Sequence, residues 1–78
     1  MVKDTVKKIV IETLNISEDR YREDLAIGDI PEWDSLGHVQ LLQRIEAEFQ
    51  IALDVADAID IETIEDIVDA VNKYKMQS

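Results

Sequence analysis

The stretch Trp33-Asp34-Ser35-Leu36-Gly37-His38-Val39-Gln40-Leu41-Leu42 opens an amphipathic helix in the middle of the chain. Asp34 or Ser35 suits the N-cap, because a short oxygen side chain accepts hydrogen bonds from the first N–H groups of a helix. Pro31 rules out an earlier start, since the residue before a proline avoids helical backbone angles. The helix runs to about Gln50, and its predicted inner stripe is Val39, Leu42, Ile45 and Phe49, flanked by Leu36 and Leu41.

Three other segments also show helical patterns. Apolar residues recur at helical spacing over residues 2–15, and a short helix follows Asp54 and ends near Ile59. Thr63 is the expected cap of the last helix, with Asp66 three residues on as a weak capping box. The buried stripe of that helix is Ile64, Ile67, Val68 and Val71. The sequence therefore predicts an all-α fold, a small four-helix bundle of three main helices and one short helix.

The connection over residues 16–34 has no clean period and forms a long first loop. Ser17-Glu18-Asp19 can start a short helical turn, and Gly28-Asp29 indicates a bend before the proline. A loop this long in so small a domain is usually functional or attached to the core. The apolar residues expected to attach it are Leu25, Ile27, Ile30 and Trp33.

Size and composition predict a single soluble domain over residues 1–78, without disulfides because the chain has no cysteine. No apolar run approaches the roughly 20 residues that span a bilayer, and the N-terminus shows no secretory pattern. We therefore expect a cytosolic protein, without membrane insertion and most simply a monomer.

Negative charge is concentrated in the middle of the chain. The net charge is −10, and residues 23–72 hold fourteen acidic residues against one base, Arg44. Such a field repels nucleic acid and anionic lipid, which excludes nucleic-acid partners. It favours partner proteins that carry basic patches.

The sequence supports neither a catalytic role for Ser35 nor a metal site elsewhere in the chain. A nucleophilic serine needs a base held by a third group, and His38, the only histidine, has no such group in the sequence. The acidic cluster near the short helix lacks the spacing and the glycine of a calcium loop: Asp54, Asp57, Asp60 and Glu62. A serine at a helix N-terminus, where N–H groups and the helix dipole favour a phosphate, suits covalent modification.

The longer pattern resembles acyl carrier proteins. The resemblance rests on Trp33 to Leu42, on the helix that ends in Ile45-Glu46-Ala47-Glu48-Phe49, on the long first loop and on Thr63-Ile64 at the start of the last helix. It covers nearly the whole chain. It implies a carrier that makes no bonds itself.

The resemblance implies specific roles for residues around Ser35. Ser35 would receive phosphopantetheine from coenzyme A, through a separate phosphopantetheinyl transferase that uses Mg²⁺, and the cofactor thiol would hold acyl groups as thioesters. Asp34 would help the transferase or serve only as the helix cap. The residues that match partner-contacting positions are Leu36, Val39, Gln40, Glu46 and Glu48. The implied partners are acyl-activating, condensing or acyltransferase enzymes with basic patches.

Three departures from the usual pattern point away from standard fatty-acid synthesis. Gln40 stands where fatty-acid carriers typically have glutamate, Arg44 adds a positive charge, and Gly37-His38 differs from the usual residues. They favour a dedicated carrier for a specialised pathway over a carrier for standard fatty-acid synthase enzymes. The pathways that the resemblance implies are fatty-acid, polyketide or specialised lipid or secondary biosynthesis. An aminoacyl, peptidyl or alanyl carrier is an alternative, as is an unmodified helical interaction module whose Ser35 is only a cap.

Overall fold

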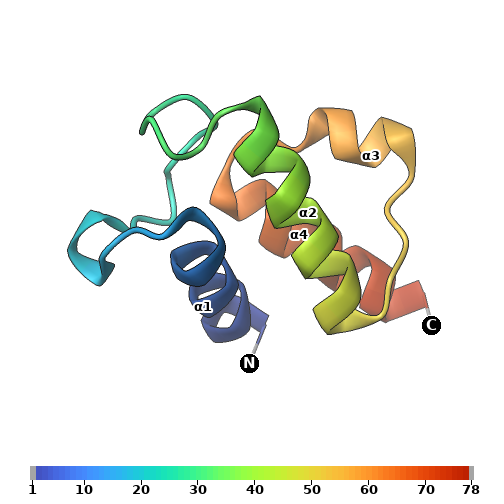
Figure 1. Ribbon diagram of the computed structural model, residues 1–78. Coiled ribbons are helices and arrows are strands. Elements are labelled where there is room, and N and C mark those ends of the chain that lie inside the picture. Colours follow the sequence, from blue (N-terminus) through green and yellow to red (C-terminus); the bar gives the residue numbers. More distant parts are fainter. Residues whose placement is uncertain (1, 78) are drawn as a thin grey trace.

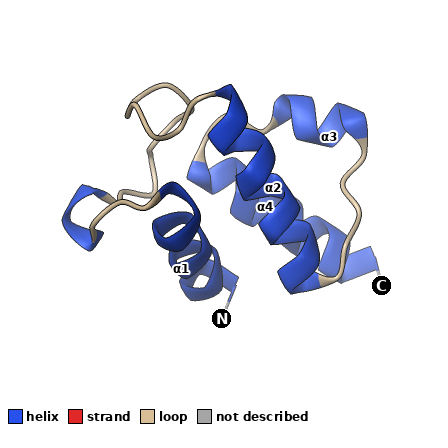
Figure 2. Ribbon diagram, in the orientation of Figure 1, coloured by secondary structure: helices blue, strands red, loops and turns tan. Residues whose placement is uncertain are grey.

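The computed structural model describes residues 2–77 and shows a bundle of helices (Figure 1). The helices are α1 (Val2–Leu14), α2 (Ser35–Phe49), the short α3 (Val55–Asp60) and α4 (Ile64–Gln77), with a 3₁₀ turn at Glu18–Arg20. Over these residues Figure 2 shows helices and loops without a strand, and Ala26 and Thr63 form one isolated β-bridge. The predicted all-α class is confirmed. No helix between residues 2 and 77 is long and apolar enough to cross a membrane.

An aliphatic core lies among the three long helices, where α1 packs against both α2 and α4 (Figure 1). Burial of apolar surface is the main force that stabilises such a core. Trp33 is the one aromatic residue among its fully buried side chains. The predicted stripe of α4 is confirmed in full. The buried core is Val6, Ile9, Val10, Leu14, Ile16, Leu25, Trp33, Leu41, Leu42, Ile45, Ile61, Ile64, Ile67, Val68 and Val71.

The predicted inner stripe of α2 is wrong at Val39. The side chain of Val39 is 52% exposed, whereas Leu41, expected only to flank the stripe, is fully buried. The buried face of α2 runs through Gly37, Leu41, Leu42 and Ile45. Leu42 and Ile45 of the predicted stripe are buried. Because glycine adds nothing to an apolar pattern, no residue in the sequence indicates that the buried face begins at Gly37.

Backbone and side-chain bonds attach the long loop to the bundle. Ile27 N–H donates to the Glu62 carbonyl over 2.8 Å, and Ile64 N–H donates to the Leu25 carbonyl over 3.0 Å. Arg20 donates two hydrogen bonds, of 2.6 and 2.8 Å, to the Glu32 carboxylate. Of the predicted attachment residues, Leu25 and Trp33 are buried and Ile30 is partly buried, but Ile27 is exposed. Its bond to Glu62 shows that the backbone, and not the Ile27 side chain, anchors this part of the loop.

The predicted capping box of α4 is confirmed. Asp66 N–H donates to Thr63 Oγ1 over 3.1 Å, and Thr63 N–H donates to Asp66 Oδ2 over 3.2 Å. This reciprocal pair satisfies N–H groups that have no partner within the helix.

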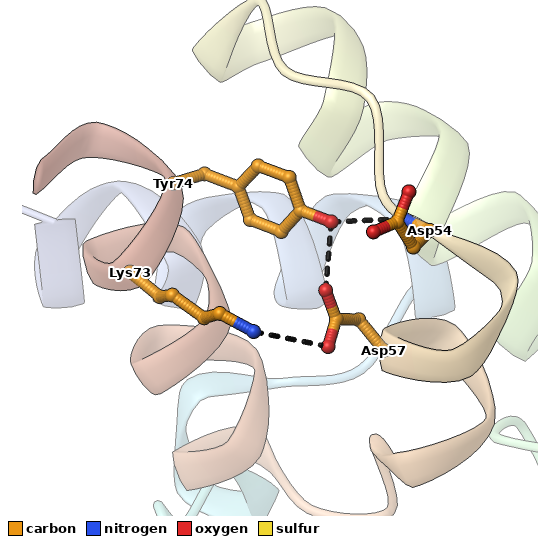
Figure 3. A network of polar contacts seen from close by, with 4 residues as sticks. All are labelled: Asp54, Asp57, Lys73 and Tyr74. Carbon is orange, nitrogen blue, oxygen red and sulfur yellow. Dashed lines mark hydrogen bonds and ion pairs between the residues drawn. The ribbon is translucent and has the colours of Figure 1, made fainter. Parts of the chain in front are cut away.

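Polar contacts hold the start of α3, which contributes no buried residue (Figure 3). Asp54 is its N-cap as predicted, but the Asp54 side chain makes no capping bond. The Tyr74 hydroxyl instead accepts from Asp54 N–H over 2.9 Å and donates to Asp57 Oδ2 over 2.7 Å. Lys73 Nζ lies 3.3 Å from Asp57 Oδ1. Both partners belong to α4, so α4 fixes where α3 begins.

Candidate functional site

Ser35 is the first residue of α2 and its side chain is exposed. The helix begins there because Asp34 has an extended backbone, with φ −98° and ψ −170°, and its Oδ1 accepts a 2.8 Å hydrogen bond from Gly37 N–H. His38 N–H is the first to reach back along the helix, to the Asp34 carbonyl at 2.8 Å. Of the two predicted N-caps, Asp34 is therefore the one observed.

The cap leaves two backbone donors beside the Ser35 hydroxyl. In any α-helix the first N–H groups lack an intrahelical acceptor, and here Gly37 N–H is taken up by Asp34. The N–H groups of Ser35 and Leu36 remain, at the positive end of the helix dipole. An exposed hydroxyl next to such donors fits a phosphodiester.

Gly37 lets the preceding loop lie directly against the first turn of α2. A Cβ at this position would be 2.6 Å from the Glu32 carbonyl oxygen and 3.3 Å from Leu14 Cδ2. Real Cβ atoms essentially never come this close to a backbone oxygen, so a larger residue requires the loop to shift. Gly37 therefore sets the close packing that brings Trp33 under the start of the helix.

His38 joins the end of the long loop to α2. Trp33 Nε1–H donates to His38 Nδ1 over 3.0 Å, and the two rings are stacked with centroids 6.0 Å apart. Burial lowers the pKa of the imidazole, and a hydrogen bond to the Ala58 backbone raises it. Because Nδ1 accepts from Trp33, the neutral ring carries its proton on Nε2.

This arrangement removes His38 as a base for Ser35. Its Nδ1 lone pair is occupied by the buried Trp33 indole. The sequence showed that His38 had no orienting partner, but not that Trp33 occupies it. Trp33 and His38 are five residues apart, on either side of the helix start. That spacing alone does not indicate that the two side chains form a hydrogen bond.

Exposed apolar side chains flank the point where α2 meets α3. Leu36 and Val39 of α2 are 66% and 52% exposed, and Val55 and Ile59 of α3 are 77% and 71% exposed. We call these four residues the apolar surface. Leu36 and Val39 of this surface were predicted from the sequence, whereas Val55 and Ile59 were not. The i, i+4 spacing of Val55 and Ile59 on a very short helix was the available signal.

Polar residues predicted to meet partners differ in their surroundings. Gln40 and Glu48 are exposed. Glu46 is partly buried, and its Oε2 accepts a 2.9 Å hydrogen bond from Leu53 N–H, which ties the segment before α3 to α2. Arg44 Nη2 lies 3.6 Å from Glu12 Oε1 of α1. Among residues 2–77, no group of three or more acidic, histidine or cysteine side chains is arranged to hold a metal ion.

Known proteins resemble this chain over almost its entire length. Residues 4–71 match the family described as "Phosphopantetheine attachment site". Acyl carrier proteins from two strains of Buchnera aphidicola subsp. Acyrthosiphon pisum, Tuc7 and APS, are each 29% identical over 76 residues, or 97% of this chain and 95% of the relative. The solution NMR structure of holo acyl carrier protein from Geobacter metallireducens has a TM-score of 0.85 at 21% identity, covering 97% of this chain and 87% of that one.

These comparisons agree with the site at the start of α2. The structural match confirms the fold, and the family match spans the cap, the exposed serine and three of the helices completely or nearly so. Members of this family are carriers and not enzymes, they hold phosphopantetheine covalently, and they interact with a phosphopantetheinyl transferase and with biosynthetic enzymes. This chain belongs to the acyl carrier protein family, whose members hold phosphopantetheine covalently.

Proposed function

We propose that Ser35 is the attachment site of phosphopantetheine. The observation that carries this proposal is an exposed serine hydroxyl at the capped N-terminus of α2, next to the N–H groups of Ser35 and Leu36. Ser17, outside the long helices, has no comparable helix terminus behind it, because it precedes only the three-residue turn Glu18–Arg20.

Ser35 is the acceptor in a reaction that a separate transferase catalyses with Mg²⁺. A bond forms between Ser35 Oγ and the phosphorus that bears the pantetheine arm of coenzyme A, the P–O bond that bridges the two phosphorus atoms breaks, and adenosine 3′,5′-bisphosphate leaves. The hydroxyl proton passes to the transferase, since His38 Nδ1 is already occupied by Trp33. Once attached, the cofactor supplies a thiol that holds an acyl group as a thioester. Asp34 holds the helix end and its carboxylate is available to the transferase.

We propose that partner enzymes bind the surface formed by α2. Leu36 and Val39 supply apolar contact, because both are exposed on a helix whose other face is buried. Gln40 and Glu48 are exposed beside them, and Glu46 retains one carboxylate oxygen apart from its bond to Leu53. Exposed charges of this kind chiefly tune the association rate and its salt dependence.

We propose further that the chain serves a dedicated pathway for specialised lipids or secondary metabolites. Gln40 and Arg44 make the middle of α2 less negative than the fatty-acid carriers whose pattern has glutamate at the Gln40 position. A partner that binds this helix therefore needs fewer basic groups along it. Acyl-activating, condensing and acyltransferase enzymes from fatty-acid synthesis should bind it weakly.

Intact mass tests the attachment site. The chain is incubated with coenzyme A, Mg²⁺ and a broad-specificity phosphopantetheinyl transferase, beside the variants Ser35→Ala and Ser17→Ala. We expect one phosphopantetheinyl group on the parent and on Ser17→Ala, and none on Ser35→Ala. A modified Ser35→Ala variant would overturn the proposal.

A loading assay tests the cargo. The modified chain is offered acyl-activating enzymes and aminoacyl-activating enzymes in parallel, and thioester formation is followed by mass. We expect acyl groups to be loaded, because the similar proteins are acyl carriers. Loading by amino acids alone would instead identify an aminoacyl carrier.

A further inference from the structure

A polar groove lies between α1 and α2. It has a volume of about 410 Å³, within the range of small-molecule sites, about 300–1,000 Å³. In Figure 1, α1 and α3 lie to either side of α2, so this groove is separate from the apolar surface that α2 shares with α3. The residues that line the groove are all polar: Glu12 and Thr13 of α1, and Gln40, Gln43 and Arg44 of α2.

The three groove residues from α2 form one exposed patch. Gln40, Gln43 and Arg44 are three and four positions apart, so their side chains are neighbours on the helix surface. A glutamine amide both donates and accepts hydrogen bonds, and a guanidinium only donates. Within residues 2–77, the side chains of Gln40 and Gln43 have no hydrogen-bond partner. Their donors and acceptors are therefore available to a ligand.

The α1 wall of the groove adds an acceptor and an unpaired hydroxyl. Glu12 Oε1 lies 3.6 Å from Arg44 Nη2, and the side chains of Arg44 and Glu12 are 52% and 50% exposed. That distance is longer than a hydrogen bond, so both charged groups keep their hydrogen-bonding capacity. Thr13 Oγ1 is buried and has no partner in the described part of the chain. Because buried polar atoms are nearly always paired, this wall contains an unusual unsatisfied group.

The groove begins close to Ser35. At a rise of 1.5 Å per residue, Gln40 lies about 8 Å and Arg44 about 14 Å from Ser35 along the axis of α2. An extended phosphopantetheine arm spans roughly 15 Å from phosphorus to sulfur, since three bonds of an extended chain cover about 3.5 Å. An arm that follows α2 from Ser35 therefore reaches along the whole groove.

We propose that this groove is a resting site for the phosphopantetheine arm, in which Gln40, Gln43 and Arg44 bind the two amide groups of the arm. The proposal rests on the proposed modification of Ser35. Each amide of the arm has one donor and one acceptor, which the glutamine amides, the guanidinium and the Glu12 carboxylate complement. The side chains of the apolar surface offer no hydrogen bonds to these amides. With the arm in the groove, the apolar surface stays uncovered for partner enzymes.

NMR spectroscopy of the modified chain tests the resting site. The isotopically labelled protein is modified with unlabelled coenzyme A, so that protons of the arm are distinguished from those of the protein. We expect nuclear Overhauser effects between the arm and the side-chain amides of Gln40 and Gln43. The backbone amide signals of Thr13 and Arg44 should shift on modification. Overhauser effects from the arm to Val55 and Ile59 in place of the groove residues would overturn the proposal.

A double variant tests the hydrogen bonds. Gln40→Met with Gln43→Met removes both amides and keeps unbranched side chains of similar length. The equilibrium constant between resting and free arm should fall about two- to tenfold, as expected for one lost hydrogen bond. The measure is a smaller shift of the Thr13 amide on modification. Glu65→Met, at an exposed position of α4 outside the groove, is the matched control and should keep the parental shift. Equal shifts in the parent and the double variant would contradict the assignment.

Free pantetheine separates this proposal from the proposed function. Ser35→Ala leaves the groove residues unchanged and removes the proposed attachment oxygen. At millimolar concentration, the effective concentration of a tethered group, free pantetheine should shift the Thr13 and Arg44 amides of this variant. If the transferase does not modify the parent, the attachment site is wrong, and this titration still reports on the groove. If the parent is modified but neither the arm nor free pantetheine shifts these amides, the attachment site stands and the resting site fails.

Discussion

The Trp33 indole donates a 3.0 Å hydrogen bond to Nδ1 of His38, and the two rings stack at an interplanar angle of 28°. This pair joins the end of the long loop to the second turn of α2. Because Trp33 is the only tryptophan in the chain, its fluorescence reports directly on His38.

Acidification should destabilise the protein through His38. Burial lowers the pKa of His38 from 6.5, and the Ala58 backbone opposes this shift. As the pH falls through 6.5 the unfolded chain therefore binds more protons than the folded chain, so the free energy of unfolding decreases. Above pH 6.5, neutral His38 makes its full contribution to the free energy of unfolding. Below pH 6.5 this contribution declines until the pH has passed the pKa of His38 in the folded protein. Protonated Nδ1 can no longer accept from Trp33.

Urea unfolding followed by tryptophan fluorescence, between about pH 8 and about pH 5, measures this effect. His38→Gln lacks the titrating group and should lose this part of the slope. A hydrogen bond from Arg20 lowers the pKa of Glu32 from 4.5, and one from Tyr74 lowers the pKa of Asp57 from 3.8. The stability that these carboxylates contribute is therefore lost only below pH 4.5 for Glu32 and below pH 3.8 for Asp57. Identical slopes for parent and variant above pH 5 would contradict the assignment.

Gly37→Ala should destabilise the protein although it lies in a helix. In an ordinary helix interior this change stabilises by about 0.5–1 kcal/mol. Here the added Cβ would lie 2.6 Å from the Glu32 carbonyl oxygen. Neither atom can move away without a shift of the backbone. We expect a loss of about 1–3 kcal/mol in the free energy of unfolding, as for other overpacked sites. Gln43→Ala, at an exposed position of α2, is the control in the same urea measurement. A more stable Gly37→Ala variant would show that the loop moves freely.

Two substitutions at Asp34 separate its cap from its charge. Asp34→Ala removes the acceptor for Gly37 N–H and should lower stability by about 0.5–2 kcal/mol. Asp34→Asn keeps an acceptor and should fold nearly as stably as the parent. If the transferase uses the carboxylate, Asp34→Asn is modified more slowly despite normal stability. Modification at the parental rate would leave Asp34 with the capping role alone.

Added salt should stabilise the protein. The net charge is −10, and like charges on a small fold repel one another. The ion pairs that salt also screens, such as Lys3 with Glu23, are mostly exposed and contribute little. We expect the thermal midpoint of the unmodified chain to rise with sodium chloride and further with a divalent cation. A midpoint insensitive to both would show that repulsion is unimportant here.

The exposure of Val39 illustrates the limit of periodicity in this chain. An apolar count over α2 placed Val39 inside, although the buried face passes through Gly37 and Leu41. At Gly37 the loop lies so close to the helix that an added Cβ would be 2.6 Å from the Glu32 carbonyl oxygen and 3.3 Å from Leu14 Cδ2. Similarly, Ile16 lies in the core without belonging to any helix. Both outcomes depend on residues outside the helix turn concerned.

The order and approximate bounds of the helices, a helix start at Asp34 or Ser35 and the capping box at Thr63 could be predicted from the sequence alone. These features depend on residues within about four positions of one another, so a linear pattern records them. The similarity to a family rests on a pattern spread over nearly the whole chain. Only the tertiary structure decided how His38 is bonded, that Gly37 is buried and that Tyr74 holds α3. Each of these depends on contacts between segments brought together by folding, and the free energy of a packed contact depends on the shape of both partners.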